Sequence, residues 1–130
     1  MAFRKSTGLA NAIASSFGAL FASGTLQVRT GAQPASANDA AAGSLLATIT
    51  IPSAPFGSPS AGVISKANTW SAVATGTGVA AHGRFISNDG LKIFDVSIAE
   101  SGGDLTIDDE DVVTGGNVVV TAFTYTVPLT

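Results

Sequence analysis

The carboxylates of this chain are concentrated in one region, which ends in the acidic run Asp108–Asp111. Eight of the nine Asp and Glu residues lie between positions 89 and 111. Ca²⁺ takes about six to eight oxygen ligands, so the run is a candidate cation site. The spacing fits no EF-hand loop, because the glycine that such a loop needs is missing. We therefore interpret the run as a solvated acidic turn and predict no bound metal or cofactor.

One histidine and one glycine-rich stretch are the other candidates for chemistry. Residues 76–81 have the pattern G-x-G-x-x-A, which binds dinucleotides only where a helix follows. Here residues 79–86 alternate like a strand, so we reject nucleotide binding. In that strand His82 shares a face with Arg84, which predicts a solvated position. No nucleophile-elbow motif is present, and the sequence predicts that the protein is not an enzyme.

The single tryptophan, Trp70, permits two interpretations. It lies in the segment 67–74 with alanines on its side, a pattern typical of core packing. An exposed indole would instead offer a stacking platform for a sugar. Together with a cation at the acidic run, that second interpretation defines an alternative function, a receptor- or glycan-binding β module.

The composition excludes several partners. Charged residues make up 12% of the chain, against about 25% in an ordinary soluble domain. Such a weakly polar surface loses its water easily and suits contact with other protein copies. Six scattered Lys and Arg residues and a net charge of −3 provide no basic patch, so we expect no nucleic acid partner. The absence of cysteine fits assembly in a reducing cytoplasm.

Residues 1–23 predict an N-terminal arm and an amphipathic helix, which we expect over residues 7–22. Ser6 or Thr7 can cap its start, and Gly24 stands where a helix would stop. Polar residues interrupt the apolar run, so we predict neither a secretory signal nor a membrane span. The helix either covers one end of a sheet or docks on a neighbouring molecule. We predict partner contacts at four of its apolar positions: Leu9, Ile13, Phe17 and Phe21.

Residues 24–130 predict one mainly β domain, an antiparallel β-sandwich or barrel. The hydrophobic period changes to two, in Val- and Thr-rich runs separated by Gly-, Asn- and Asp-containing turns. Residues 31–43 and 52–62 are polar or proline-rich and predict extended loops. Phe56, in the second loop, either grips a partner or folds back on its own sheet. The predicted partner contacts beyond the helix are Pro34, Phe56 and Trp70.

Several stretches resemble small virion proteins of tailed bacteriophages. They are the opening MAFRKSTGL (1–9), residues 21–39 and 43–49, and the ending, residues 105–107 and 116–124. The matched residues include no catalytic or ligand-binding motif. The resemblance therefore implies a structural part of a virus particle.

Virion proteins of this kind are mostly head-associated, so the resemblance implies a capsid decoration (cement) protein located in the virion. Its partners would be the major capsid protein and neighbouring copies of itself, in a trimer or another symmetric homo-oligomer. A tail or head–tail junction component is the alternative within the same group. Because no long apolar run is present, we also expect no membrane partner.

Overall fold

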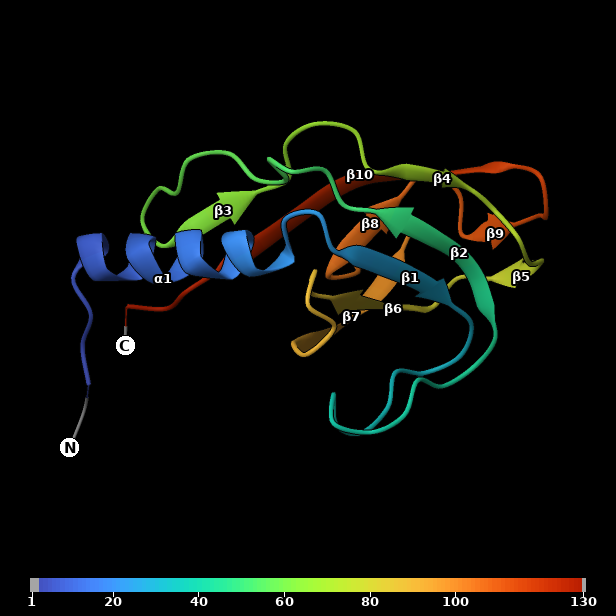
Figure 1. Cartoon of the computed structure of the whole chain (residues 1–130), viewed down its shortest axis with the longest axis horizontal. Coiled ribbons are helices and arrows are strands. Elements are labelled where there is room, and N and C mark those ends of the chain that lie inside the picture. The colour runs from blue at the N-terminus through green and yellow to red at the C-terminus, as the bar shows by residue number, and fades with distance from the viewer. Residues whose placement is uncertain (1–2, 130) are drawn as a thin grey trace.

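The computed structural model describes residues 3–129, which fold into one N-terminal helix followed by strands (Figure 1). Helix α1 spans Thr7–Phe21. The strands are β1 Thr25–Arg29, β2 Leu45–Thr50, β3 Val63–Ser65, β4 Ser71–Val73, β5 Gly78–Val79, β6 His82–Ile86, β7 Ile93–Ala99, β8 Leu105–Ile107, β9 Asp111–Val112 and β10 Asn117–Thr126. The mainly β prediction with one N-terminal helix is confirmed.

Helix α1 begins and ends close to the predicted positions because its caps are local. The Ser6 side chain accepts a hydrogen bond from Leu9 N at 3.2 Å, and Ala22 N donates to Gly18 O at the other end. The face that packs against the sheet is nevertheless the one with small residues. Its buried positions are Ala10, Ala14, Gly18 and Phe21.

The strands form one curled sheet in the order β2-β1-β6-β7-β8-β10-β3, with β4 also paired to β10. Thr75 N and Gly76 N donate to Leu46 O, so the segment after β4 meets β2 and the sheet nearly returns on itself. This curl agrees with the sandwich or barrel prediction. Strands β5 and β9 form a separate two-stranded ribbon.

One strand pair corrects the all-antiparallel expectation. Strands β7 and β8 are parallel and pair only at Ile98↔Leu105 and Ala99↔Thr106. Their connection, residues 100–104, contains Gly102 at φ 79°, a left-handed conformation that favours glycine. The connection returns the chain beside the end of β7, so the parallel pairing stays short.

An aromatic network joins the helix to the sheet. The ring of Phe17 stacks on Tyr125 with centroids 3.7 Å apart and 8° between the planes. Trp70 is fully buried and lies edge-on to Phe85, with centroids 5.9 Å apart. The network also includes Phe21, Phe56, Phe94 and Phe123. The core therefore runs across the predicted boundary between residues 1–23 and 24–130.

Candidate functional site

The acidic run uses its carboxylates to hold turns. Asp108 Oδ1 accepts hydrogen bonds from Asp109 N at 3.0 Å and Val119 N at 3.2 Å. Asp109 Oδ1 accepts from Asp111 N at 2.9 Å. Such Asx contacts satisfy backbone donors that no strand partner reaches. Within residues 3–129, no group of three or more His, Asp and Glu side chains is placed to hold a metal ion.

The glycine-rich stretch leads into strands. Strand β5 starts at Gly78, and β6 follows from His82. A phosphate site of the predicted pattern needs a helix N-terminus at this point, and the structure has none among residues 76–86. The expectation that strand and not helix follows this motif is confirmed.

The predicted solvation of His82 is wrong, because loop 31–43 covers it. His82 is 1% exposed and Arg84 is 6% exposed. His82 Nδ1 lies 2.7 Å from Gly31 O. Because a carbonyl only accepts, Nδ1 carries the proton and donates. His82 Nε2 is buried and has no hydrogen-bond partner among the described residues.

Arg84 fastens the same loop. Its Nε and Nη2 donate to Asp95 Oδ1 at 2.8 Å and Oδ2 at 2.9 Å, and its Nη1 donates to Asp39 O at 2.9 Å. The hydrogen bond to Asp95 raises the pKa of Arg84 above its ordinary value, although burial acts in the opposite direction. The charge is therefore fixed and paired, and the His82–Arg84 face holds a loop in place.

Two of the predicted partner contacts have no surface left for a partner. Trp70 is 0% exposed and donates through Nε1 to Ala67 O at 3.1 Å, so the sugar-platform interpretation is wrong. Phe21 is 4% exposed. Both rings are needed by the aromatic core, which explains their burial.

The other predicted contacts keep part of their surface. Leu9 is 51% exposed and Ile13 is 38% exposed. Phe17, Pro34 and Phe56 are half-buried. Phe56 follows the second interpretation given above, because its ring packs edge-on against Trp70 with centroids 5.5 Å apart.

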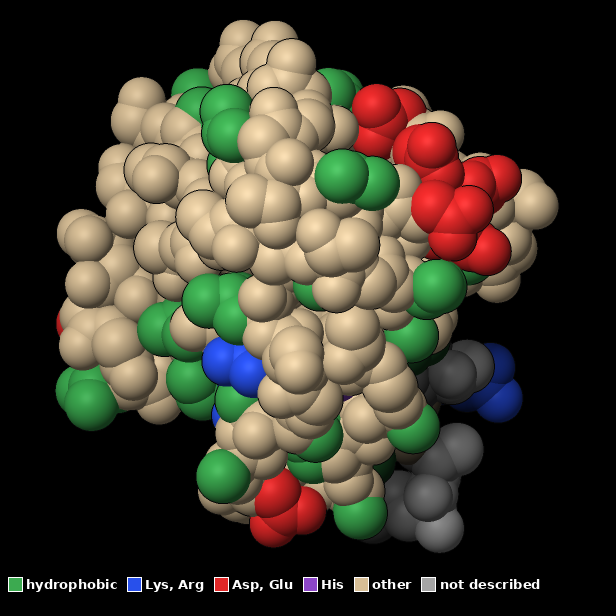
Figure 2. Space-filling view, turned by 90° about the vertical axis from the view of Figure 1, so that its right-hand side faces the viewer, with side chains coloured by type: hydrophobic (Ala, Val, Ile, Leu, Met, Phe, Trp, Pro, Cys, Tyr) green, Lys and Arg blue, Asp and Glu red, His purple; other side chains and the backbone are tan. Residues whose placement is uncertain are grey.

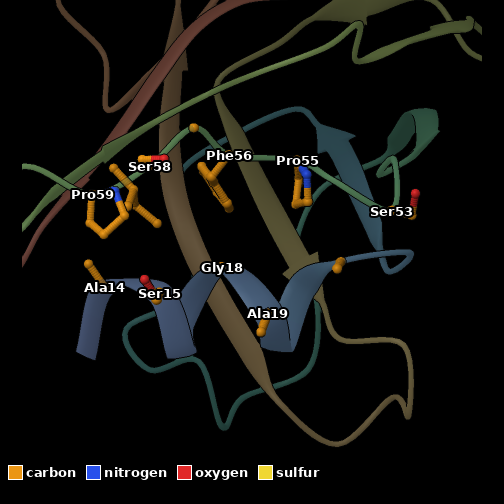
Figure 3. Close-up of a pocket in the computed structure, with 12 residues that line it drawn as sticks. Ala14, Ser15, Gly18, Ala19, Ser53, Pro55, Phe56, Ser58 and Pro59 are labelled. Carbon is orange, nitrogen blue, oxygen red and sulfur yellow. The ribbon is translucent and has the colours of Figure 1, made fainter. Parts of the chain in front are cut away.

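A groove of about 430 Å³ lies between α1 and the arm formed by residues 53–59. Figure 3 shows Phe56 pointing from the arm toward Gly18 of the helix, with Pro55 and Pro59 on either side. None of the residues that line the groove is ionisable. It is therefore suited to contact by shape, and it offers no acid or base.

A second groove, of about 410 Å³, opens between β7 and β10, next to the residues that precede β8. Phe94 and Tyr125 line it together with Asp104. The Asp104 carboxylate accepts from Ser97 N at 3.1 Å, and Asp104 N donates to Ser97 Oγ. The sequence signal for this groove is the shortness of the alternating run at residues 105–107.

No protein family, curated protein or solved structure matches this chain. None of the helical residues described forms a segment long and apolar enough to cross a membrane.

Proposed function

We propose that this protein is a structural component of a tailed-phage particle, and specifically a capsid decoration protein. In this role it binds the major capsid protein and stabilises the shell. The proposal is based on the resemblance of its terminal and early segments to small virion proteins. The observation that supports it most is helix α1, which contains no charged residue and leaves Leu9, Ile13 and Leu20 exposed.

Such a surface suits contacts that are repeated many times. Uncharged helix positions lose little hydration energy when another protein covers them. Each contact can be weak, because linked contacts on a symmetric shell raise the overall avidity by about 10²–10⁴. The rigid aromatic core supplies the fixed shape that repeated contacts require.

We also propose that the protein has no catalytic activity. Its candidate reactive groups are engaged elsewhere: His82 and Arg84 hold loop 31–43, and the acidic run holds turns. The rival glycan-binding hypothesis loses its aromatic platform, because Trp70 is buried. A tail or head–tail junction component remains the alternative, and copy number separates a connector or fibre from a decoration protein.

The test compares particles assembled with and without this chain. We expect the protein to co-sediment with particles, and particles that carry it to retain their genome to a higher temperature. The double variant Leu9→Ser/Ile13→Ser should bind particles more weakly, because it removes exposed apolar surface from α1. Leu91→Ser is the matched control, since Leu91 is 78% exposed in the turn between β6 and β7. Particles that are equally heat-resistant without the protein would refute the cement role.

A further inference from the structure

The two ends of the molecule carry apolar faces with opposite charges beside them. Helix α1 lies at one end, and strands β5 and β9 lie at the other (Figure 1). On α1, residues 9, 13 and 20 are separated by four and seven positions, which places their side chains along one side of the helix. Leu9, Ile13 and Leu20 are 51%, 38% and 45% exposed. The exposed cation Arg4 precedes this helix face.

At the opposite end of the molecule, the β5–β9 ribbon presents an exposed outer face. Val79 pairs with Asp111, so their side chains lie on the same face of the ribbon, and Val113 follows directly after β9. Val79 and Val113 are 54% and 61% exposed, whereas Val112 on the other face is 4% exposed. Figure 2 views this end and shows acidic side chains gathered along one flank, beside hydrophobic ones. This ribbon face therefore combines two valines with a carboxylate.

We infer that the helix face of one molecule binds the ribbon face of a second copy. Charge complementarity supports this occupant: the exposed cation Arg4 precedes helix α1 at one end, and Asp111 is exposed among acidic side chains at the other end. The helix contributes no charge of its own that would have to lose water. Leu9, Ile13 and Leu20 then cover Val79 and Val113, and both sets of apolar side chains leave water.

The contact joins two different faces, so it is heterologous. Each bound copy still presents one free face of each kind, and the assembly closes into a ring, a trimer included, or extends as a filament. This inference rests on the proposed structural role, in which many copies lie side by side. In that role α1 strengthens particle binding by joining neighbouring copies, so that their separate contacts with the shell act together. It names the surfaces that join those copies, and it can be tested without any particle.

Sedimentation velocity of the purified full chain over a range of concentrations tests the inference. We expect the wild type to grow beyond dimers as its concentration rises. Ile13→Asp on the helix face and Val79→Asp on the ribbon face should each weaken association at least about tenfold, since an unpaired carboxylate in the contact costs more than about 1.4 kcal/mol. Leu91→Asp, at the more exposed Leu91 in the turn between β6 and β7, alters neither set of face residues and should associate like the wild type. All positions are exposed, and circular dichroism melting checks that each variant folds.

An equimolar mixture of the two face variants gives the sharpest result. Ile13→Asp keeps a working ribbon face and Val79→Asp keeps a working helix face, so the mixture should stop at heterodimers. A wild type that stays monomeric at every concentration overturns the inference. So do face variants that associate like the wild type, or a mixture that remains monomeric.

An exchange of charges tests the electrostatic part of the proposed contact between copies. Arg4→Glu and Asp111→Lys should each weaken association, and mixing them should restore it, because each altered end meets an opposite charge on the other variant. No rescue in the mixture would overturn the proposed pairing of these charges. Self-association without particle binding would refute the proposed function alone, and particle binding by a strict monomer would refute this inference alone.

Discussion

Asp89 shows how the carboxylates of this chain act at the level of single residues. In the turn between β6 and β7 its side chain accepts hydrogen bonds from Lys92 Nζ at 2.6 Å and from Leu91 N at 3.0 Å, and also from Ser87 Oγ. These contacts hold the pKa of Asp89 well below its usual range, and the hydrogen bond from Lys92 contributes most. The same use of carboxylates as turn acceptors recurs in the acidic run.

The depressed pKa of Asp89 predicts a pH-dependent contribution to stability. A carboxyl whose pKa is lower in the folded state stabilises the fold above its unfolded pKa, about 3.9, and this contribution is lost as the pH falls below that value. Asp89→Asn should therefore lower the melting temperature at pH 7, and its difference from the wild type should shrink toward pH 2. Thermal melts across this pH range measure the effect. Lys92→Met should show a similar but smaller change, whereas a constant difference between wild type and Asp89→Asn at all pH values would contradict the account.

The residue scale also shows where sequence reasoning failed. His82 and Arg84 alternate with apolar neighbours in a way that indicates a solvated strand face, and that signal is correct for an uncovered sheet. The face is covered because loop 31–43 is anchored by contacts such as His82 Nδ1 to Gly31 O, between positions 51 residues apart. No local pattern encodes a contact of that range.

At the scale of elements, local sequence signals predicted where the helix and strands occur, but they did not predict which face of the helix is buried. The predicted cap at Ser6 or Thr7 marked the start of α1, and the period-two pattern predicted that strands follow the helix. The buried face of α1 was harder to predict, since Leu9 and Ile13 dominate the hydrophobic pattern. The structure buries the small residues because Phe56 and Ile64 approach the helix closely at Gly18.

This packing predicts the effect of enlarging Gly18. A Cβ at this position would lie 2.9 Å from Phe56 Cδ2 and 3.5 Å from Ile64 Cδ1. Gly18→Val should therefore destabilise the protein by about 1–3 kcal/mol, because overpacking outweighs the gain in helix propensity. Gly8→Val is the control, since the nearest atom to a Cβ there is 4.0 Å away. Urea unfolding measures both, and equal stability of the two variants would contradict the close packing of arm and helix.

The same groove explains the outcome for Phe56. An aromatic residue in a proline-rich loop is compatible with a partner contact and with folding back, and the sequence left both open. Gly18 has no side chain, so the helix leaves room for the Phe56 ring at this point. Phe56 therefore folds back and packs on its own domain, against Trp70. Trp70 is buried for a related reason, because Phe56 and Phe85 enclose it within one aromatic network.

At the scale of the whole molecule, the two ends differ in charge while most of the surface is weakly polar. The fold class was predictable from hydrophobic periods, since a change from helical spacing to alternation marks the helix and the sheet. The parallel β7–β8 pair and the opposed end faces were not, because they depend on how distant segments meet. A chain whose polar groups hold its own loops, and which has a set of exposed apolar side chains at each end, is suited to a role in assembly.

The number of copies per particle tests that role most directly. Quantitative mass spectrometry of purified phage particles, with the major capsid protein as internal reference, gives this number. The account predicts hundreds of copies, as expected of a protein that decorates a shell. About a dozen copies would assign the protein to a connector or fibre, and its absence from particles would contradict a structural role in the virion.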